Sequence, residues 1–125
     1  MLNVVTLIGR LTADPELRKT TRGTSVVNFT LAVDRDRREN GEVVTDFVEC
    51  TAWSFAAEFL AEHAKKGGRV AVNGRLQESR WVDKKDGQSR RGHFVMVDNL
   101  YPLSRSQPSA EEEVQPEIPD VPSEL

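Results

Sequence analysis

The chain has 125 residues, of which 38% are hydrophobic and 30% are charged, and this suits one soluble domain with a core of its own. No apolar run is long enough to cross a membrane and the N-terminus lacks the parts of a signal peptide, so we expect a cytoplasmic protein. The net charge of −3 combines a mildly basic body with an acidic tail, and one cysteine with two histidines excludes an intramolecular disulfide and a Cys/His zinc site within one chain.

The first part of the chain predicts two strands and a hairpin turn. Residues 3–11 are rich in β-branched side chains and predict a strand, and turn signals follow in residues 12–24. Residues 25–34 alternate apolar and polar side chains and predict a second strand. Residues 35–42 predict a polar hairpin loop that turns at its Asn-Gly pair.

Residues 43–53, with the sequence V-V-T-D-F-V-E-C-T-A-W, predict a third strand whose two faces differ. Small apolar side chains, Cys50 and Ala52 among them, occupy one face and suit a core. Phe47 and Trp53 share the other face with a glutamate, which burial would leave without a partner. We therefore expect this face to meet water and to offer two flat rings, about 20 Å apart at roughly 3.3 Å per residue, to a flat ligand.

After residue 53 the spacing of the apolar side chains changes from the period of a strand to that of a helix. Residues 54–66 predict a helix with Ser54 as its N-terminal cap. Residues 69–82 predict a fourth strand, broken or bent at Gly74, and residues 92–100 predict a fifth.

Three strands, one helix and two strands in this order are typical of the five-stranded Greek-key barrel of the OB class. We therefore predict an all-β fold with one short helix. In that architecture a ligand lies across one sheet face between two long loops, which here would be residues 35–42 and 83–91. These loops hold the densest basic stretches of residues 1–103.

Trp81 repeats the pattern of the third strand, because it alternates onto one face with Arg75 and lies close in sequence to Arg80, Lys84 and Lys85. Rings flanked by cations favour single-stranded nucleic acid, since bases stack on rings for about 1–3 kcal/mol each while the backbone follows the positive groove. The alternative is that all three aromatics pack in the barrel or in an interface, because tryptophan is well buried on average.

The sequence shows no catalytic arrangement. Neither His63 nor His93 has a serine or cysteine companion at a readable spacing, and Glu58 and Glu62 fit an exposed helix face better than an acid–base pair. We predict a binding protein without catalytic residues, metal or cofactor. Three alternatives remain open: an OB-type module that binds protein, a nuclease, and RNA as the ligand in place of DNA.

Residues 1–103 resemble the bacterial single-stranded DNA-binding protein family. The resemblance lies in four segments that are highly specific together: V-T-L-I-G-R-L-T-A-D-P-E-L-R (5–18), V-V-N-F-T-L-A-V-D-R (26–35), T-D-F-V-E-C-T-A-W (45–53) and K-K-G-G-R-V-A-V-N-G-R-L-Q-E-S-R-W (65–81). It implies an OB-fold homotetramer that coats single-stranded DNA with little sequence preference in replication, recombination and repair, in the cytoplasm at the nucleoid.

By this resemblance the family's base-stacking aromatics fall on Phe47, Trp53 and Trp81. The candidate phosphate-binding and groove cations are Arg10, Arg35, Arg37, Arg38, Lys66, Arg75, Arg80, Lys84 and Lys85. Some members carry a further tryptophan after the second strand, where this chain has Asp36-Arg37-Arg38.

Residues 104–125 predict a second region, a disordered acidic tail. Six carboxylates against one arginine give it a net charge of −5, which leaves +2 on residues 1–103, the predicted OB domain. The family's tail closes with an acidic tip and Pro-Phe that docks on replication and repair enzymes. Here the tail ends without an aromatic residue, and its candidate partner-binding residues are Asp120, Glu124 and Leu125.

Overall fold

The computed structural model describes residues 1–103, apart from the side chains of residues 37–39. Its elements in chain order are β1 (Val5–Leu11), β2 (Arg18–Lys19), β3 (Ser25–Glu39), β4 (Glu42–Trp53), α1 (Ser54–His63), β5 (Arg69–Val82) and β6 (Ser89–Pro102). The predicted tail, residues 104–125, lies outside the described residues, and so do Asp120, Glu124 and Leu125.

The strands form one sheet in the order β1-β5-β6-β4-β3-β2, and β1 closes it by pairing with β3 as well. Because β2 has only two residues, five strands make up the closed barrel. β4 and β6 pair in parallel, at Cys50–Val95 and Thr51–Met96, while the other described pairs are antiparallel. The predicted OB-type fold, mostly β with one short helix, is confirmed.

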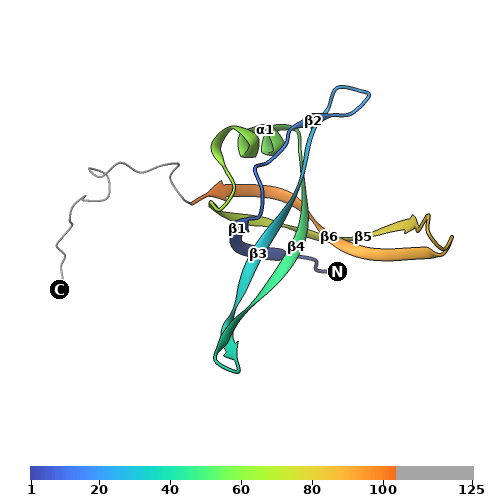
Figure 1. Ribbon diagram of the computed structural model, residues 1–125. Coiled ribbons are helices and arrows are strands. Elements are labelled where there is room, and N and C mark those ends of the chain that lie inside the picture. Colours follow the sequence, from blue (N-terminus) through green and yellow to red (C-terminus); the bar gives the residue numbers. More distant parts are fainter. Residues whose placement is uncertain (104–125) are drawn as a thin grey trace.

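The core lies on the face of the third predicted strand that carries its small apolar side chains, as the alternation along that strand predicts. On β4, Cys50 is 1% exposed and Ala52 is 0% exposed, and they pack with apolar side chains from every other barrel strand. α1 covers one end of the barrel (Figure 1) and buries Leu60 there. The buried hydroxyl of Ser25 on β3 donates a hydrogen bond of 2.7 Å to Glu58 of α1, which ties the helix to the sheet.

The two ends of α1 differ from the prediction. Trp53 occupies the N-cap position without a side-chain hydrogen bond, and Ser54 is the first helical residue, with a φ of 55°. This left-handed turn redirects the chain from β4 into α1, so the serine shapes the corner in place of capping the helix. The helix ends at His63, three residues before the predicted end, because Ala64 already has an extended backbone.

Two long hairpins project from the barrel where the sequence predicts loops (Figure 1). β3 and β4 stay paired out to Glu39 and Glu42, and the chain reverses at Asn40 and Gly41 with φ angles of 53° and 80°, which confirms the predicted turn. The predicted loops were too long, because antiparallel pairing uses backbone groups and tolerates polar side chains where both faces meet water. We call residues 34–45 the β3–β4 arm and residues 77–94 the β5–β6 arm.

The bend predicted at Gly74 is confirmed. The register between β5 and β6 shifts between Asn73 and Gly74, and a Cβ on Gly74 would lie 2.1 Å from the carbonyl oxygen of Met96. Only glycine fits this approach of two backbones, and the shift sets the alternation of every later residue on β5.

Candidate functional site

Phe47 and Trp53 lie on the outer face of β4, as predicted. Phe47 is 66% exposed and Trp53 is 39% exposed, while Cys50 and Ala52 alternate with them into the core. Between the two rings Glu49 remains at the surface, where both carboxylate oxygens lie 3.2 Å from the Thr30 hydroxyl that donates to them. The prediction that these rings meet water is therefore confirmed.

Trp81 lies on the same face of the sheet, although it comes from the β5–β6 arm. Thr51 on the outer face of β4 pairs with Met96 of β6, and Met96 pairs in turn with Arg75 of β5. Counting alternate residues from Arg75 leads to Trp81, which is 50% exposed. Strand register thus places all three aromatics on one continuous face, which we call the aromatic face.

Two cations on the β3–β4 side, Arg10 and Arg35, are held by carboxylates. Arg10 donates to both oxygens of Asp34, at 3.0 and 3.3 Å, and Arg35 donates to both oxygens of Asp46, each at 3.0 Å. The hydrogen bonds from Arg10 and Thr45 hold the pKa of Asp34 below its ordinary value, and that from Arg35 lowers the pKa of Asp46. The side chains of Arg37 and Arg38 lie outside the described part of the chain.

The remaining candidate cations fall into two groups. Arg75 contacts Asp98 at 3.2 Å and Arg80 contacts Glu78 at 3.0 Å, so these two arginines are also ion-paired. The lysines differ from the arginines, because within the described residues the structure gives their side chains no ion pair or hydrogen bond. These lysines are Lys66, Lys84 and Lys85.

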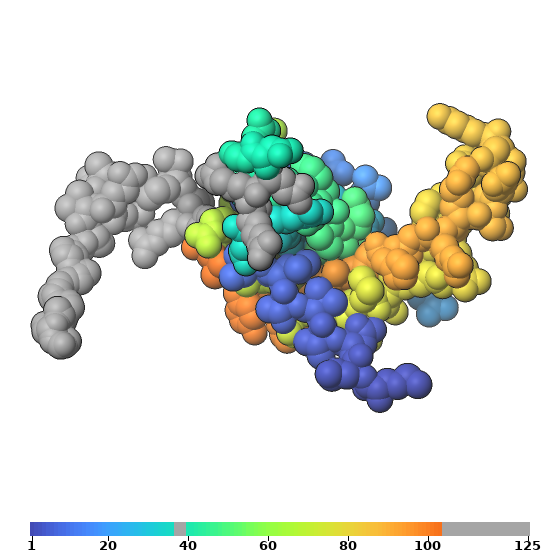
Figure 2. Space-filling view, turned by 90° about the horizontal axis from the view of Figure 1, so that it is seen from below, coloured from blue at the N-terminus to red at the C-terminus, as the bar shows by residue number. Residues whose placement is uncertain are grey.

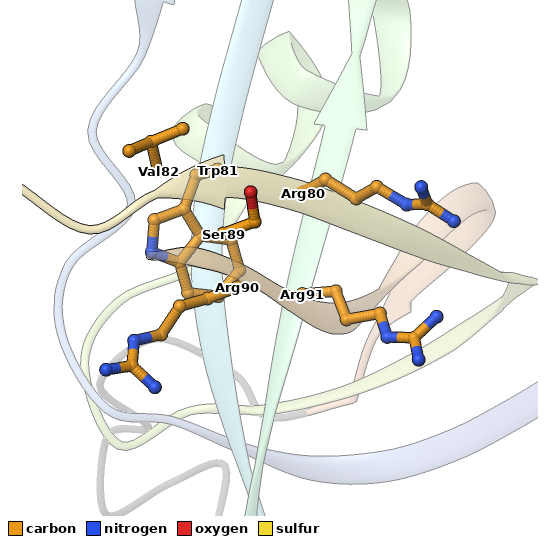
Figure 3. Close-up of a pocket in the computed structure, with 6 residues that line it drawn as sticks. All are labelled: Arg80, Trp81, Val82, Ser89, Arg90 and Arg91. Atoms are coloured by element: carbon orange, nitrogen blue, oxygen red, sulfur yellow. The ribbon is translucent and has the colours of Figure 1, made fainter. Parts of the chain in front are cut away.

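The β5–β6 arm carries its cations on both faces, and an open pocket of about 400 Å³ lies along it (Figure 3). Arg90 shares the face of Trp81, where it is bound by Asp83 and Asp86. Arg80 and Arg91 pair across the two strands and project from the opposite face, away from Trp81. Arg80 is therefore next to Trp81 in sequence but not on its face, because neighbours along a strand point to opposite sides.

Arg18 is a further cation on the aromatic face that the sequence did not single out. Arg18 of β2 pairs with Val26 of β3, and Val26 pairs with Trp53 of β4, so the three side chains form one row across the sheet. Arg18 contacts Glu16 at 3.1 Å, and both side chains are largely in water. The basic run R-K-T-T-R-G was visible in the sequence, but nothing local indicates that its first arginine pairs into the sheet next to Trp53.

Groups associated with other chemistries are buried or scattered. Burial raises the pKa of the Cys50 thiol to about 12, which keeps the thiol protonated. The residues whose side chains the structure describes contain no group of three or more His, Cys, Asp or Glu placed to hold a metal ion. In the same part of the chain, no helix combines the length and the apolar character that a membrane span needs.

Comparison with known proteins gives consistent matches. The model of the "Single-strand binding protein family" matches residues 2–103. A "Single-stranded DNA-binding protein" of Halalkalibacterium halodurans is 48% identical over 101 residues, which cover 80% of this chain and 60% of that protein. "Single-stranded DNA-binding protein 1" of Lactococcus lactis is 38% identical over 118 residues, 94% of this chain and 78% of that protein. "Single-stranded DNA-binding protein A" of Bacillus subtilis is 48% identical over 89 residues, 70% of this chain, which thus spans about half of that relative.

Proposed function

This chain belongs to the single-strand binding protein family, and we propose on that premise that it binds single-stranded DNA with little sequence preference. The observation that carries the proposal is the aromatic face, on which Phe47, Trp53 and Trp81 are all exposed. Unpaired bases stack on such rings whatever their identity, whereas a duplex keeps its base faces hidden.

The lysines supply the first phosphate contacts in this proposal. Among the described residues, Lys66, Lys84 and Lys85 have no carboxylate partner, so within this part of the chain they can contact a DNA backbone without breaking an ion pair. Four arginines can contact phosphate only by giving up a carboxylate partner: Arg10, Arg35, Arg75 and Arg80. Such exchanges cost little, because ion pairs exposed to water are weak.

The wider role is proposed on family membership. We place the protein in replication, recombination and repair, as a non-enzymatic homotetramer of the cytoplasm. Its acidic tail would recruit other proteins, through Asp120, Glu124 and Leu125.

The test is a titration of the intrinsic tryptophan fluorescence with oligo(dT) at two salt concentrations. We expect saturable quenching, and an affinity whose logarithm falls with log salt by roughly 0.7 for each phosphate neutralised. A duplex of the same length is the control and should compete poorly, and an RNA oligomer tests whether the 2′-hydroxyl matters. The absence of quenching, or equal competition by the duplex, would contradict the proposal.

A further inference from the structure

The β5–β6 arm has a second face, opposite Trp81, from which the proposed function uses Arg80 alone. Register pairs Glu78 with His93 and Arg80 with Arg91 on this face, which we call the back face. Beyond the barrel both sides of the two-stranded arm meet water, and the arm stands clear of the rest of the molecule (Figure 2). The back face is therefore accessible in the described part of the chain.

One carboxylate on the back face serves two guanidinium groups. The Oε1 atom of Glu78 lies 3.0 Å from Nε of Arg80, and its Oε2 atom lies 3.4 Å from Nη1 of Arg91. The side chains of Arg80 and Arg91 remain 72% and 69% exposed, and they extend in the same direction (Figure 3). Two cations thus share one anion, and the pair keeps a surplus positive charge at the surface.

Guanidinium groups bind carboxylates and phosphates through the same planar arrangement of donors, so the two anions compete for the same N–H groups. We propose that Glu78 competes with nucleic-acid phosphate for Arg80 and Arg91, and that the back face is a second phosphate-binding site which this glutamate weakens. The inference rests on the proposed function, because it needs a strand that already contacts the aromatic face. That strand would place phosphates on both sides of the arm.

Glu78→Gln tests the proposal, because the amide keeps the shape of the side chain and removes its charge. The matched control is Glu62→Gln, which removes an exposed carboxylate from α1, outside the arm. At low salt we expect E78Q to bind oligo(dT) about two- to fivefold more tightly than E62Q, as suits the weakness of an exposed ion pair. We also expect the slope of log affinity against log salt to become steeper, by up to about 1.4 if both arginines gain a phosphate.

A double-mutant cycle separates this competition from a general effect of charge. Arg91→Gln should cost more affinity in the E78Q protein than in the wild type, because there Arg91 no longer shares a carboxylate and contacts phosphate without competition. Equal costs in the two backgrounds, or equal affinities of E78Q and E62Q, would overturn the proposal. A wild-type protein that fails to bind oligo(dT) would instead overturn the proposed function, so the two failures are distinguishable.

Discussion

The indole of Trp81 lies over Gly92 of the neighbouring strand: a Cβ on Gly92 would be 3.4 Å from Cη2 and 3.5 Å from Cζ3 of the ring. The two residues are diagonal neighbours, because Gly92 pairs with Ser79 and Trp81 pairs with Arg90. The missing side chain thus leaves a flat place against which one side of the ring rests. Trp81 is nevertheless 50% exposed, so ring surface remains for a base to stack on.

Gly92→Val should displace this ring. The branched side chain places atoms beyond Cβ, where the indole now lies, whereas Gly92→Ala adds one methyl at an ordinary contact distance and serves as the control. In a Trp53→Phe background Trp81 is the one tryptophan, so its emission maximum and its quenching by oligo(dT) report on this ring alone. We expect a shifted emission and weaker quenching for G92V and near-normal behaviour for G92A. Identical spectra for the two would show that Gly92 does not position Trp81.

Removing the rings themselves should weaken binding. Trp53→Ala and Trp81→Ala each take away one platform, and we expect each to cost about 1–3 kcal/mol of binding free energy to oligo(dT). Each variant keeps the other tryptophan as a probe. Phe55→Ala is the control, because Phe55 is 75% exposed but lies on α1, where it stacks on Phe59. If both tryptophan variants bound like F55A, the exposed rings would have another purpose.

The sequence predicted what depends on strand alternation and missed what depends on register. Phe47 and Trp53 were placed outside and Cys50 inside, because a strand sends successive side chains to opposite faces whatever it pairs with. The partner of Arg10 could not be read in the same way. Asp34 lies 24 positions away, and only the pairing of β1 with β3 brings the two together.

The pair formed by Arg10 and Asp34 should be visible in a titration. Asp34 has a pKa below its ordinary value of 3.8, mainly through the hydrogen bond from Arg10. A depressed folded-state pKa means that this interaction stabilises the protein above the ordinary value and is lost as pH falls through the folded value. Carboxyl NMR should show Asp34 titrating below pH 3.8 in the wild type and moving upward in Arg10→Gln.

Arg35→Gln is the matched control for that titration. It should raise the pKa of Asp46, which Arg35 lowers, and leave that of Asp34 in place. Equal shifts of both carboxyls in either variant would indicate a general loss of positive charge in place of two separate pairs.

Arg18 should extend the binding surface beyond Trp53. Its row with Val26 and Trp53 places the guanidinium on the aromatic face, within reach of the backbone of a strand that stacks on the indole. We expect Arg18→Gln to weaken oligo(dT) binding and to lower the salt slope by about 0.7, the value for one phosphate on a single strand. Lys19→Gln removes the same charge from the next residue, which pairs with buried Ser25 and so points to the other face. If K19Q lost as much affinity as R18Q, the net charge of β2 would matter and its register beside Trp53 would not.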